Sequence, residues 1–274
     1  MSPDASPPAI DVAIVNWNTA EAAIAAARAY LASAGVKVSV TIVDNDSRPE
    51  QRDLLREGCP ENVRLELSEE NLGYGRAANR ALHGGSAELV CVSNPDVVVE
   101  PGALAALAEV ARREPQAGMV GPVFAGDTNR YHASLPRTAT MLARIFAGSF
   151  GGRSQPSPAA GALVEVGQPS GACFVVIREA WEAMGGFDEG FFLWYEDVDL
   201  AKRLHDAGYR NLIVGSARVG HAGAKAFVQI DRREQQAIRL RSVERYIRLH
   251  HARAMPIAAP LLRLSRRLRA GGAR

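Results

Sequence analysis

The first half of the chain alternates short apolar runs, rich in β-branched residues, with alanine-rich amphipathic stretches. Short continuous apolar runs are typical of buried strands, whereas apolar residues three or four positions apart are typical of helices. The pattern predicts strands at residues 11–17, 37–43, 63–67 and 88–93, and helices at residues 19–33, 50–57, 73 onward and 103–113. Strands that alternate with helices in this way predict an α/β fold with a mostly parallel central sheet and helices on both faces.

The pattern changes after Gly118. Residues 125–170 are rich in Gly, Pro and Ser, which predicts a loop-rich region that orders when ligand is present. The later pattern predicts a strand at 172–177, a helix at 196–207 closed by Gly208, a short strand ending at 221 and a helical C-terminus from 231. We therefore expect a disordered terminus at 1–9, an α/β half at 10–124, a second half at 125–230 and a helical tail at 231–274.

Composition narrows the class of protein. A chain of 274 residues, 47% of them hydrophobic, can bury one sizeable core. Cys59, Cys91 and Cys173 are scattered, which argues against a disulfide framework or a zinc site and fits a reducing compartment. The first ten residues lack the features of a signal peptide, and no apolar run reaches the roughly 18 residues that span a bilayer. We expect a cytoplasmic protein, at most peripheral on the inner face of the membrane.

Charge is distributed unevenly along the chain. Residues 239–274 hold ten arginines and one acid, a net charge of +9, which leaves 22 basic and 29 acidic residues, or −7, in the remainder. An acidic body with a basic tail is not typical of a nucleic-acid-binding domain, so we expect no nucleic-acid partner. Leu261, Leu264 and Leu268 share one helical face, which predicts contact with an anionic membrane. A solvated helix packed on its own domain explains the same pattern.

Polar clusters directly follow three predicted strands. They are Asn16-Trp17-Asn18, Asp44-Asn45-Asp46-Ser47 and Asn94-Pro95-Asp96. Any one of them is explained by the preference of Asn and Asp for turns. Three at the same edge of a parallel sheet predict a polar ligand, because ligands gather beyond the carboxyl ends of such strands.

The segment from Asn71 to Asn79 enters a predicted helix through two glycines. Gly73 and Gly75 would let the backbone approach a ligand, and a helix N-terminus favours negative charge. The segment lacks both the G-x-G-x-x-G pattern and the P-loop lysine, so a plain helix start explains it equally well.

The strongest chemical signal lies in residues 185–203, which read GGFDEGFFLWYEDVDLAKR. Glu196, Asp197 and Asp199 fall in the first turn of a predicted helix, where the helix dipole favours each acid by about 0.3–1 kcal/mol. The dipole does not account for the aromatic run at 191–195. Aromatic side chains beside carboxylates make a partly dry cleft, which suits a sugar and raises the basicity of a carboxylate toward that of a general base.

Five motifs in this order resemble the family 2 glycosyltransferases. They are D-N-D-S at 44–47, N-L-G-Y-G-x-A-x-N at 71–79, N-P-D at 94–96, G-G-F-D-E-x-F-F at 185–192 and Y-E-D-V-D-L at 195–200. The resemblance covers about residues 10–225 and is closest to the bacterial rhamnosyltransferase-like branch, which builds cell-wall, O-antigen and related polysaccharides. It implies a GT-A fold, in which a Rossmann-like nucleotide-binding half joins a mixed acceptor-binding half.

The resemblance implies a donor site in the first half of the chain. Asp44 would accept a hydrogen bond from the imide N–H of uracil or thymine, and Asn16 and Trp17 would line that pocket. The donor-side residues would be Asn16, Trp17, Asp44, Asn45, Asn71, Gly73, Asn79 and Asn94. The donor would be a dTDP- or UDP-linked sugar, with dTDP-L-rhamnose suggested by the branch.

The resemblance also implies a divalent cation, Mg²⁺ or Mn²⁺, at the diphosphate. Asp96 would bind it and His221 would complete the site, although a buried, hydrogen-bonded histidine is the simpler explanation of His221 without the family pattern. The usual D-x-D motif has Asn94 at its first position here, so one carboxylate is available. Mg²⁺ tolerates this, because it is often held by one or two carboxylates together with phosphates and waters.

The chemistry implied is an inverting sugar transfer. Asp197 would be the general base with Glu196 beside it, and Asp188, Glu189 and Trp194 would lie on the acceptor side. The acceptor would be a glycan or lipid-linked hydroxyl. Two alternatives stay open: a sugar nucleotidyltransferase, which would release pyrophosphate, and a non-catalytic nucleotide-sugar-binding protein.

Overall fold

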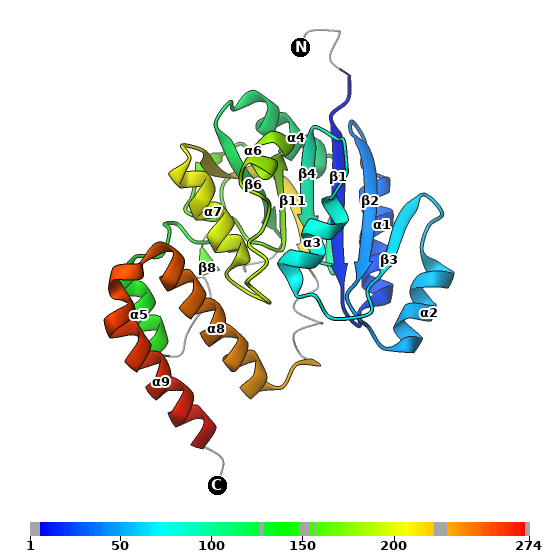
Figure 1. Ribbon diagram of the computed structural model, residues 1–274. Coiled ribbons are helices and arrows are strands. Elements are labelled where there is room, and N and C mark those ends of the chain that lie inside the picture. Colours follow the sequence, from blue (N-terminus) through cyan, green and yellow to red (C-terminus); the bar gives the residue numbers. More distant parts are fainter. Residues whose placement is uncertain (1–5, 126–128, 148–153, 156, 222–228, 272–274) are drawn as a thin grey trace.

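A nine-stranded mixed sheet forms the centre of the computed structural model, which describes residues 6–125, 129–147, 154–155, 157–221 and 229–271 (Figure 1). Its strands are β1 (Ala9–Asn16), β2 (Lys37–Asp44), β3 (Val63–Leu67), β4 (Leu89–Ser93), β5 (Val97–Val99), β6 (Ala117–Phe124), β9 (Leu163–Glu165), β10 (Cys173–Ile177) and β11 (Arg210–His221). The order across the sheet is β3–β2–β1–β4–β10–β6–β11–β5, and β9 pairs with β11. Two short strands, β7 (Asn129–Arg130) and β8 (Ser154–Gln155), pair separately.

Most strands run in one direction. β3, β2, β1 and β4 are parallel neighbours, and β10 is antiparallel to both β4 and β6. Consequently β6 and its parallel neighbour β11 resume the direction of the first four strands, while β5 and β9 oppose it. The expected mostly parallel sheet is confirmed. Because β9, β10 and β11 lie beyond residue 125, the two predicted halves share this sheet, and the division at 124/125 stays a prediction.

Helices cover both faces of the sheet. One face carries α1 (Ala20–Leu31), α2 (Pro49–Gly58) and α4 (Ala103–Arg113), and the other carries α3 (Tyr74–Leu82), α6 (Arg178–Ala183) and α7 (Glu196–Asp206). The alternation of side chains along a strand divides the core between these layers. In β1, Ile10, Val12 and Ile14 enter the first layer, whereas Ala13 and Val15 enter the second.

The predicted elements of the first half are present, with small differences at their ends. The prediction was wrong at β6, where the regular pattern was expected to stop at Gly118. Every residue of β6 is buried, but Gly118, Gly121 and Pro122 interrupt its apolar run. The last strand, expected to be short, has 12 residues in β11.

The region expected to be loops, 125–170, contains a helix, α5 (Thr138–Ala147), besides β7, β8 and β9. Residues 126–128, 148–153 and 156 of this region lie outside the described residues, as do residues 1–5 of the terminus expected to be disordered. Ala9, the last residue of that predicted terminus, already belongs to β1.

The C-terminal segment forms a helical hairpin of α8 (Arg232–His250) and α9 (Met255–Gly271), joined through a 3₁₀ turn at Ala252–Ala254. The two helices and α5 lie together beside α7 (Figure 1). Their shared core contains Met141, Tyr246 and Leu262, together with Phe191 and Tyr195 from the segment before α7. The predicted leucine stripe is present in part, because Leu264 is exposed but Leu261 packs against this core. The side chain of Leu268 lies outside the described part.

Asp199 joins the hairpin to α7. Its carboxylate is 1% exposed, with Oδ1 2.6 Å from Nε2 of His250 at the end of α8 and Oδ2 accepting from Nε of Arg203 at 2.7 Å. Arg203 also donates to the carbonyls of Met184 and Gly186. Asp199 therefore serves as a structural tie, although it stands two residues from the predicted base. No helix among the described residues is long and apolar enough to cross a membrane.

Replacing Asp199 by Ala should lower the free energy of unfolding by about 3 kcal/mol or more, because it leaves partners of a buried ion pair uncompensated. Urea denaturation would measure the loss. Asp206→Ala is the matched control on the same helix: its ion pair with Lys202 is half exposed, and its removal should cost within about 1 kcal/mol. Equal losses in the two variants would contradict the role given to Asp199.

Candidate active site

The carboxyl ends of β1, β2 and β4 bring the three predicted polar clusters to one edge of the sheet. Asn16 is in register with Asp44, and Ile14 with Ser93 just before Asn94. The expectation that these clusters share an edge is confirmed. The sheet register thus creates a polar site from segments that are far apart in the sequence.

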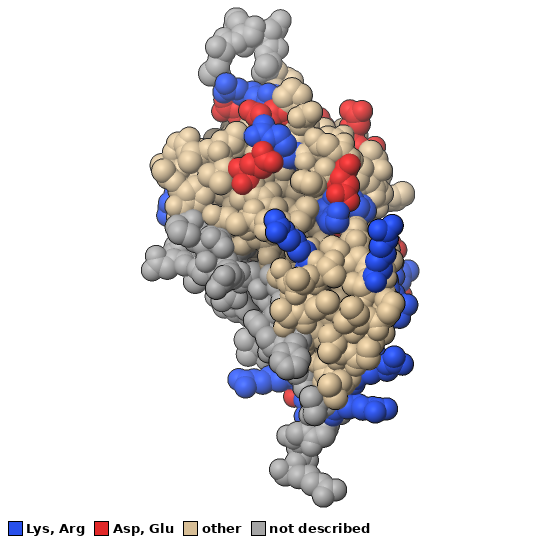
Figure 2. All heavy atoms as spheres, turned by 90° about the vertical axis from the view of Figure 1, so that its left-hand side faces the viewer, with Lys and Arg blue, Asp and Glu red and all other residues tan. Residues whose placement is uncertain are grey.

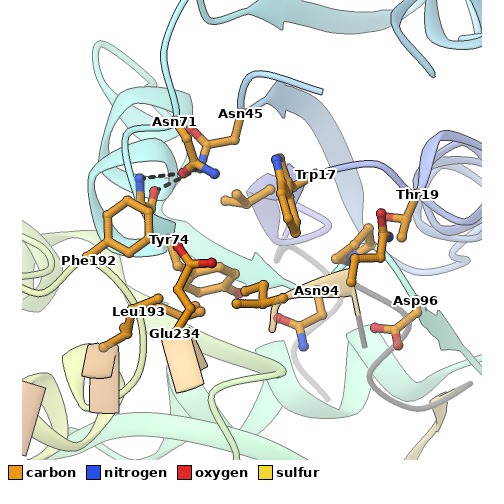
Figure 3. Close-up of a pocket in the computed structure, with 16 residues that line it drawn as sticks. Trp17, Thr19, Asn45, Asn71, Tyr74, Asn94, Asp96, Phe192, Leu193 and Glu234 are labelled. Atoms are coloured by element: carbon orange, nitrogen blue, oxygen red, sulfur yellow. Dashed lines mark hydrogen bonds between the residues drawn. The ribbon is translucent and has the colours of Figure 1, made fainter. Parts of the chain in front are cut away.

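A cavity opens at this edge (Figure 3). Its walls come from the ends of β1, β2 and β4, the start of α3, the turn before α7 and the start of α8. The lining residues are Val15, Trp17, Thr19, Asn45, Asn71, Gly73, Tyr74, Asn94, Pro95, Asp96, Phe192, Leu193, Gln229, Ile230, Glu234 and Ile238. Amide and carboxylate groups share the walls with aromatic rings, a combination that suits a ligand with both polar and ring-shaped parts.

Asn45 and Asn71 shape the wall that faces α3. Asn45 donates to Oδ1 of Asn71 at 2.9 Å and accepts from the backbone of Leu72 at 2.8 Å, and Gly73 donates to the same Oδ1 of Asn71 at 3.0 Å. Gly73 has φ +81°, and a Cβ there would stand 2.4 Å from the carbonyl oxygen of Phe192. Only glycine allows this close approach, so the two asparagines and Gly73 fix the start of α3 against the turn before α7.

Asn16 and Asp44 lie behind the cavity wall and are fully buried. Asp44 accepts from Asn16 Nδ2 at 2.9 Å, from the backbone of Ser47 at 3.1 Å and from Arg52 Nε at 3.0 Å. Its oxygens are thus engaged by the protein and do not line the cavity in this arrangement. The predicted hydrogen bond from Asp44 to a nucleobase stays a prediction, which requires at least one of these contacts to be exchanged for the base.

Asp96 and Asn94 line the cavity, and Asp96 is 7% exposed. His221 is the register partner of Val97, so the sheet places its backbone beside the residue that follows Asp96. The placement of the His221 side chain lies outside what the structure describes. Within the described residues no group of three His, Cys, Asp or Glu side chains is arranged to hold a metal.

A strained turn precedes α7. Trp194 and Tyr195 have φ of +64° and +72°, a conformation that costs non-glycine residues about 1–3 kcal/mol each. Packing holds the turn in place: Tyr195 is buried with its ring centroid 5.5 Å from that of Tyr246 on α8, and Arg239 lies 4.3 Å above the Trp194 ring. This turn directs the three acids of α7 into the interior.

Asp197 is half-buried in a shell of donors. It accepts from Gln168 Nε2 at 2.8 Å and from the N–H of Val198 at 2.8 Å, and the N–H of Gly171 also donates to it. Burial nevertheless raises the pKa of Asp197 to about 6, because the loss of hydration outweighs these hydrogen bonds. A carboxylate with a pKa close to neutral pH is suited to take a proton.

Glu196 is more deeply buried, at 5% exposure, and its Oε2 has no hydrogen-bond partner among the described residues. Burial, and then the charge of Asp197, raise the pKa of Glu196 well above its ordinary value. Burial and the neighbouring charge of Asp197 thus both disfavour the ionised form of Glu196. The two carboxyls titrate as a coupled pair, with Asp197 as the member that can act as a base near neutral pH.

Gly171 and Tyr74 connect Asp197 to the cavity. A Cβ on Gly171 would stand 2.3 Å from Oδ2 of Asp197, so this glycine gives the carboxylate its room. Ala172, the next residue, accepts from the backbone N–H of Asn94 at 2.8 Å. Tyr74 lines the cavity and its hydroxyl lies 3.5 Å from the carbonyl oxygen of Gly171. Asp197 thus lies on the Asn94–Asp96 side of the site, behind the Gly171 backbone.

The residues expected on the acceptor side do not line the cavity. Both carboxylate oxygens of Asp188 pair with Arg245 of α8. Burial alone would raise the pKa of Asp188, but the contact with Arg245 and the hydrogen bond from the Gly190 N–H lower it below its ordinary value. Glu189 accepts a hydrogen bond from the side chain of Asn79, which was expected to bind the sugar donor. The Asn79 side chain also donates to the backbone carbonyl of Phe187 and accepts from the backbone N–H of Phe187. Their acceptor and donor roles stay predictions, and their observed contacts are structural.

Sequence reasoning missed Glu234 and Ile238, which reach the cavity from α8. Glu234 extends toward the centre between Tyr74, Leu193 and Asn94 (Figure 3). The basic composition of the C-terminal segment gave no sign that its first turns would border a ligand site. The only sequence signal in this segment was Asp231, which marks where α8 begins, because its side chain accepts from the backbone N–H groups of Arg233 and Glu234.

The chain is similar in sequence to a known protein family and to known proteins. The model of the family described as "Glycosyltransferase like family 2" matches residues 7–239. N-acetylglucosaminyl-diphospho-decaprenol L-rhamnosyltransferase of Mycobacterium tuberculosis is 34% identical over 204 residues, which are 67% of this chain and 66% of that protein. The chain therefore spans just under two thirds of this relative. O-antigen biosynthesis protein RfbC of Myxococcus xanthus is 28% identical over 66% of this chain and 14% of its own length.

Two solved structures share the fold. Mannosyltransferase PcManGT from Pyrobaculum calidifontis, in complex with GDP-Man and Mn²⁺, superposes with a TM-score of 0.60 and 20% identity over 99% of this chain and 79% of its own. GalNAc-T7 with UDP, GalNAc and Mn²⁺ gives a TM-score of 0.54 and 18% identity over 80% and 44%. These likenesses confirm the expected GT-A fold.

The raised pKa of Asp197 predicts how stability depends on pH. Its folded pKa of about 6 exceeds the ordinary 3.8, so the folded state holds the proton more tightly than the unfolded chain between these values. The wild type should therefore lose roughly 1–3 kcal/mol of stability relative to Asp197→Asn as pH rises from 4 to 7. Urea denaturation of both proteins across this range measures the difference. A difference that does not change with pH would contradict the assigned pKa.

Proposed function

Because this chain belongs to glycosyltransferase-like family 2, we propose that it is an enzyme that transfers a sugar from a nucleoside diphosphate to an acceptor hydroxyl. One observation carries the proposal: Asp197, a carboxyl with a pKa of about 6, lies behind the Gly171 backbone, which the cavity-lining Tyr74 contacts. This cavity lies at the carboxyl ends of parallel strands. That edge is where open α/β sheets bind nucleotides. The transfer would invert the configuration of the sugar, since one base supports one displacement.

The donor would lie along the cavity wall formed by the ends of β1, β2 and β4. Trp17 offers a ring face for a base or a sugar, and Asn45 and Asn71 hold the wall next to it. Gly73 and Tyr74 open α3 toward the cavity, so the helix N-terminus can favour the negative diphosphate. These contacts support the donor-side assignments of Trp17, Asn45, Asn71, Gly73 and Asn94.

The residues present fit a hard divalent cation. Asp96 supplies a carboxylate and Asn94 an amide on the same wall, and the backbone of His221 lies next to this loop. Such a donor set leaves most ligand positions to phosphate oxygens and water, as is common for Mg²⁺. A bound cation would offset the charge that develops on the leaving diphosphate. We propose Asp96 and His221 as its protein ligands, with Mg²⁺ or Mn²⁺ as the ion.

Asp197 would take the proton from the acceptor hydroxyl as that oxygen attacks the anomeric carbon from the face opposite the diphosphate. Gln168 and the Gly171 N–H orient the carboxylate. Burial disfavours the ionised form of Glu196, which would limit the negative charge around Asp197. Phe192, 41% exposed in the cavity wall, offers an apolar face on which a sugar ring can pack.

The mycobacterial relative suggests the substrates. Its name specifies an L-rhamnosyl transfer to N-acetylglucosaminyl-diphospho-decaprenol, a lipid-linked acceptor. By this likeness we propose dTDP-L-rhamnose or a UDP-sugar as donor and a glycan or lipid-linked acceptor in cell-wall or polysaccharide synthesis. A lipid-linked acceptor would bring the enzyme to the membrane surface, where the arginine-rich C-terminal segment would meet anionic lipid.

Asp197→Asn should lower turnover by about 10²–10⁴-fold, the usual share of general-base catalysis, and leave donor affinity nearly unchanged. Steady-state kinetics with a nucleotide-sugar donor and an isolated acceptor would measure both. The rate of the wild type should rise with pH through about 6 and level off, because the base must be ionised. Near-normal turnover of the Asn variant would reject Asp197 as the base.

A thermal-shift panel of nucleotide sugars with Mg²⁺ or Mn²⁺ tests the donor class. A true donor at about 100 times its Kd should stabilise the protein by about 2.7 kcal/mol, and Asp96→Asn should remove the dependence on the cation. Release of pyrophosphate in place of a nucleoside diphosphate would overturn the proposal in favour of a nucleotidyltransferase. Stabilisation by donors without any turnover or donor hydrolysis would favour a binding protein.

A further inference from the structure

The outer face of α9 carries an unusual concentration of exposed apolar side chains. Ile257, Leu264 and Leu249 are 59%, 50% and 48% exposed, and they are the three most exposed large apolar side chains in the described part of the chain. Ile257 and Leu264 are seven residues apart and so lie on the same face of α9. Leu249 is the penultimate residue of α8, close before the turn that leads to Ile257.

Another face of α9 is already buried, which explains why these side chains remain outside. Ala258, Leu262 and Ser265 are 0%, 1% and 7% exposed and pack toward α5 and α8. The helix therefore already has its inner face in the core, and its outer apolar face is a second one. A helix with two apolar faces can bury both only if each packs against an apolar partner. The core shared with α5 and α8 covers one face of α9.

Basic side chains flank this outer face. Arg267 lies three residues after Leu264 and is therefore its neighbour on the surface of α9. Arg263 is exposed directly before Leu264, and Arg253 is exposed in the 3₁₀ turn that precedes α9. No ion pair of these arginines occurs within the described residues. Glu244, the sole acid from residue 239 onward, is engaged by Arg248 and Arg266.

The space-filling view shows the same arrangement on a larger scale. In the lower half of Figure 2, Lys and Arg border a surface of uncharged residues, while the acidic side chains in view lie mainly in the upper half. In Figure 1, α9 runs toward the same end of the molecule as the carboxyl ends of β1 and β2. A flat partner on this side would thus lie along α9 and extend toward the edge of the sheet that holds the cavity.

We propose that the face formed by Leu249, Arg253, Ile257, Arg263, Leu264 and Arg267 docks on an anionic lipid bilayer. The 17 residues of α9 would lie in the plane of the interface. Ile257 and Leu264 enter the boundary between headgroups and acyl chains, and the arginines bind the lipid phosphates. A bilayer fits both features at once, because it offers negative charge at its surface and apolar chains directly beneath. The inference deepens the proposed function, since it assigns to specific residues the surface that presents a lipid-linked acceptor.

Co-sedimentation of the full chain with vesicles tests this docking. The wild type should bind vesicles containing phosphatidylglycerol at least roughly tenfold more tightly than vesicles of phosphatidylcholine alone, and added salt should weaken the binding. The assay contains no donor or acceptor. A failure here would therefore leave the proposed sugar transfer intact, and a failure of transfer would leave this result intact.

Matched variants separate the face from general charge. Ile257→Asp with Leu264→Asp, and separately Arg263→Glu with Arg267→Glu, should each weaken binding by roughly tenfold or more. The control pairs, Leu54→Asp with Leu163→Asp and Arg56→Glu with Arg113→Glu, change exposed residues elsewhere on the molecule and should leave binding unchanged. Circular dichroism and urea denaturation would show that all four variants fold.

Three results would overturn the inference. Equal losses of vesicle binding in the target and control pairs would show that binding depends only on the net charge of the protein. A loss confined to the arginine pair would show that Ile257 and Leu264 do not enter the lipid. A wild type that ignores vesicles but forms a dimer, which Ile257→Asp with Leu264→Asp dissociates, would assign the face to a second copy of the chain.

Discussion

The structure depends on how three acids at the start of one buried helix are accommodated. Glu196, Asp197 and Asp199 enter the interior together, and each avoids the cost of an isolated buried charge in a different way. Asp199 forms an ion pair with Arg203 and a hydrogen bond with His250, Asp197 accepts from N–H donors, and burial disfavours the ionised form of Glu196. One helical turn therefore provides a structural tie, Asp199, and two carboxyls with raised pKa values, Asp197 and Glu196.

The C-terminal hairpin is part of this arrangement. Tyr246 and His250 hold Tyr195 and Asp199 from the far side, which keeps the strained turn at Trp194–Tyr195 in place. The same helix α8 sends Glu234 and Ile238 to the cavity. Strain beside a candidate base persists because the surrounding packing determines the turn more firmly than its own φ preferences. The hairpin thus contacts both the acid cluster of α7 and the cavity.

Two kinds of polar residue occupy the carboxyl edge of the sheet. Asn45, Asn71 and Asn94 contribute to the cavity wall, whereas Asn16 and Asp44 form the layer behind it. In sequence these residues look alike, because each is a polar residue just after a strand or before a helix. Burial and hydrogen bonding separate them: Asp44 is satisfied by Arg52 and Ser47, while the amides of the wall bind the loop of α3 and border open space.

The amino-acid sequence by itself determined the α/β layering, the shared polar edge and the acid cluster of α7, because each rests on local periodicity or on an ordered series of short motifs. It could not determine β6, whose glycines and proline hide a buried strand, or the roles of Asp188 and Asn79, which hold Arg245 and Phe187. Only the tertiary structure decided that Asp199 is a structural tie and that Asp197 is a half-buried carboxyl with a raised pKa, since their difference comes from partners 51 and 29 residues away. Contacts at such separations leave no periodic trace in the chain.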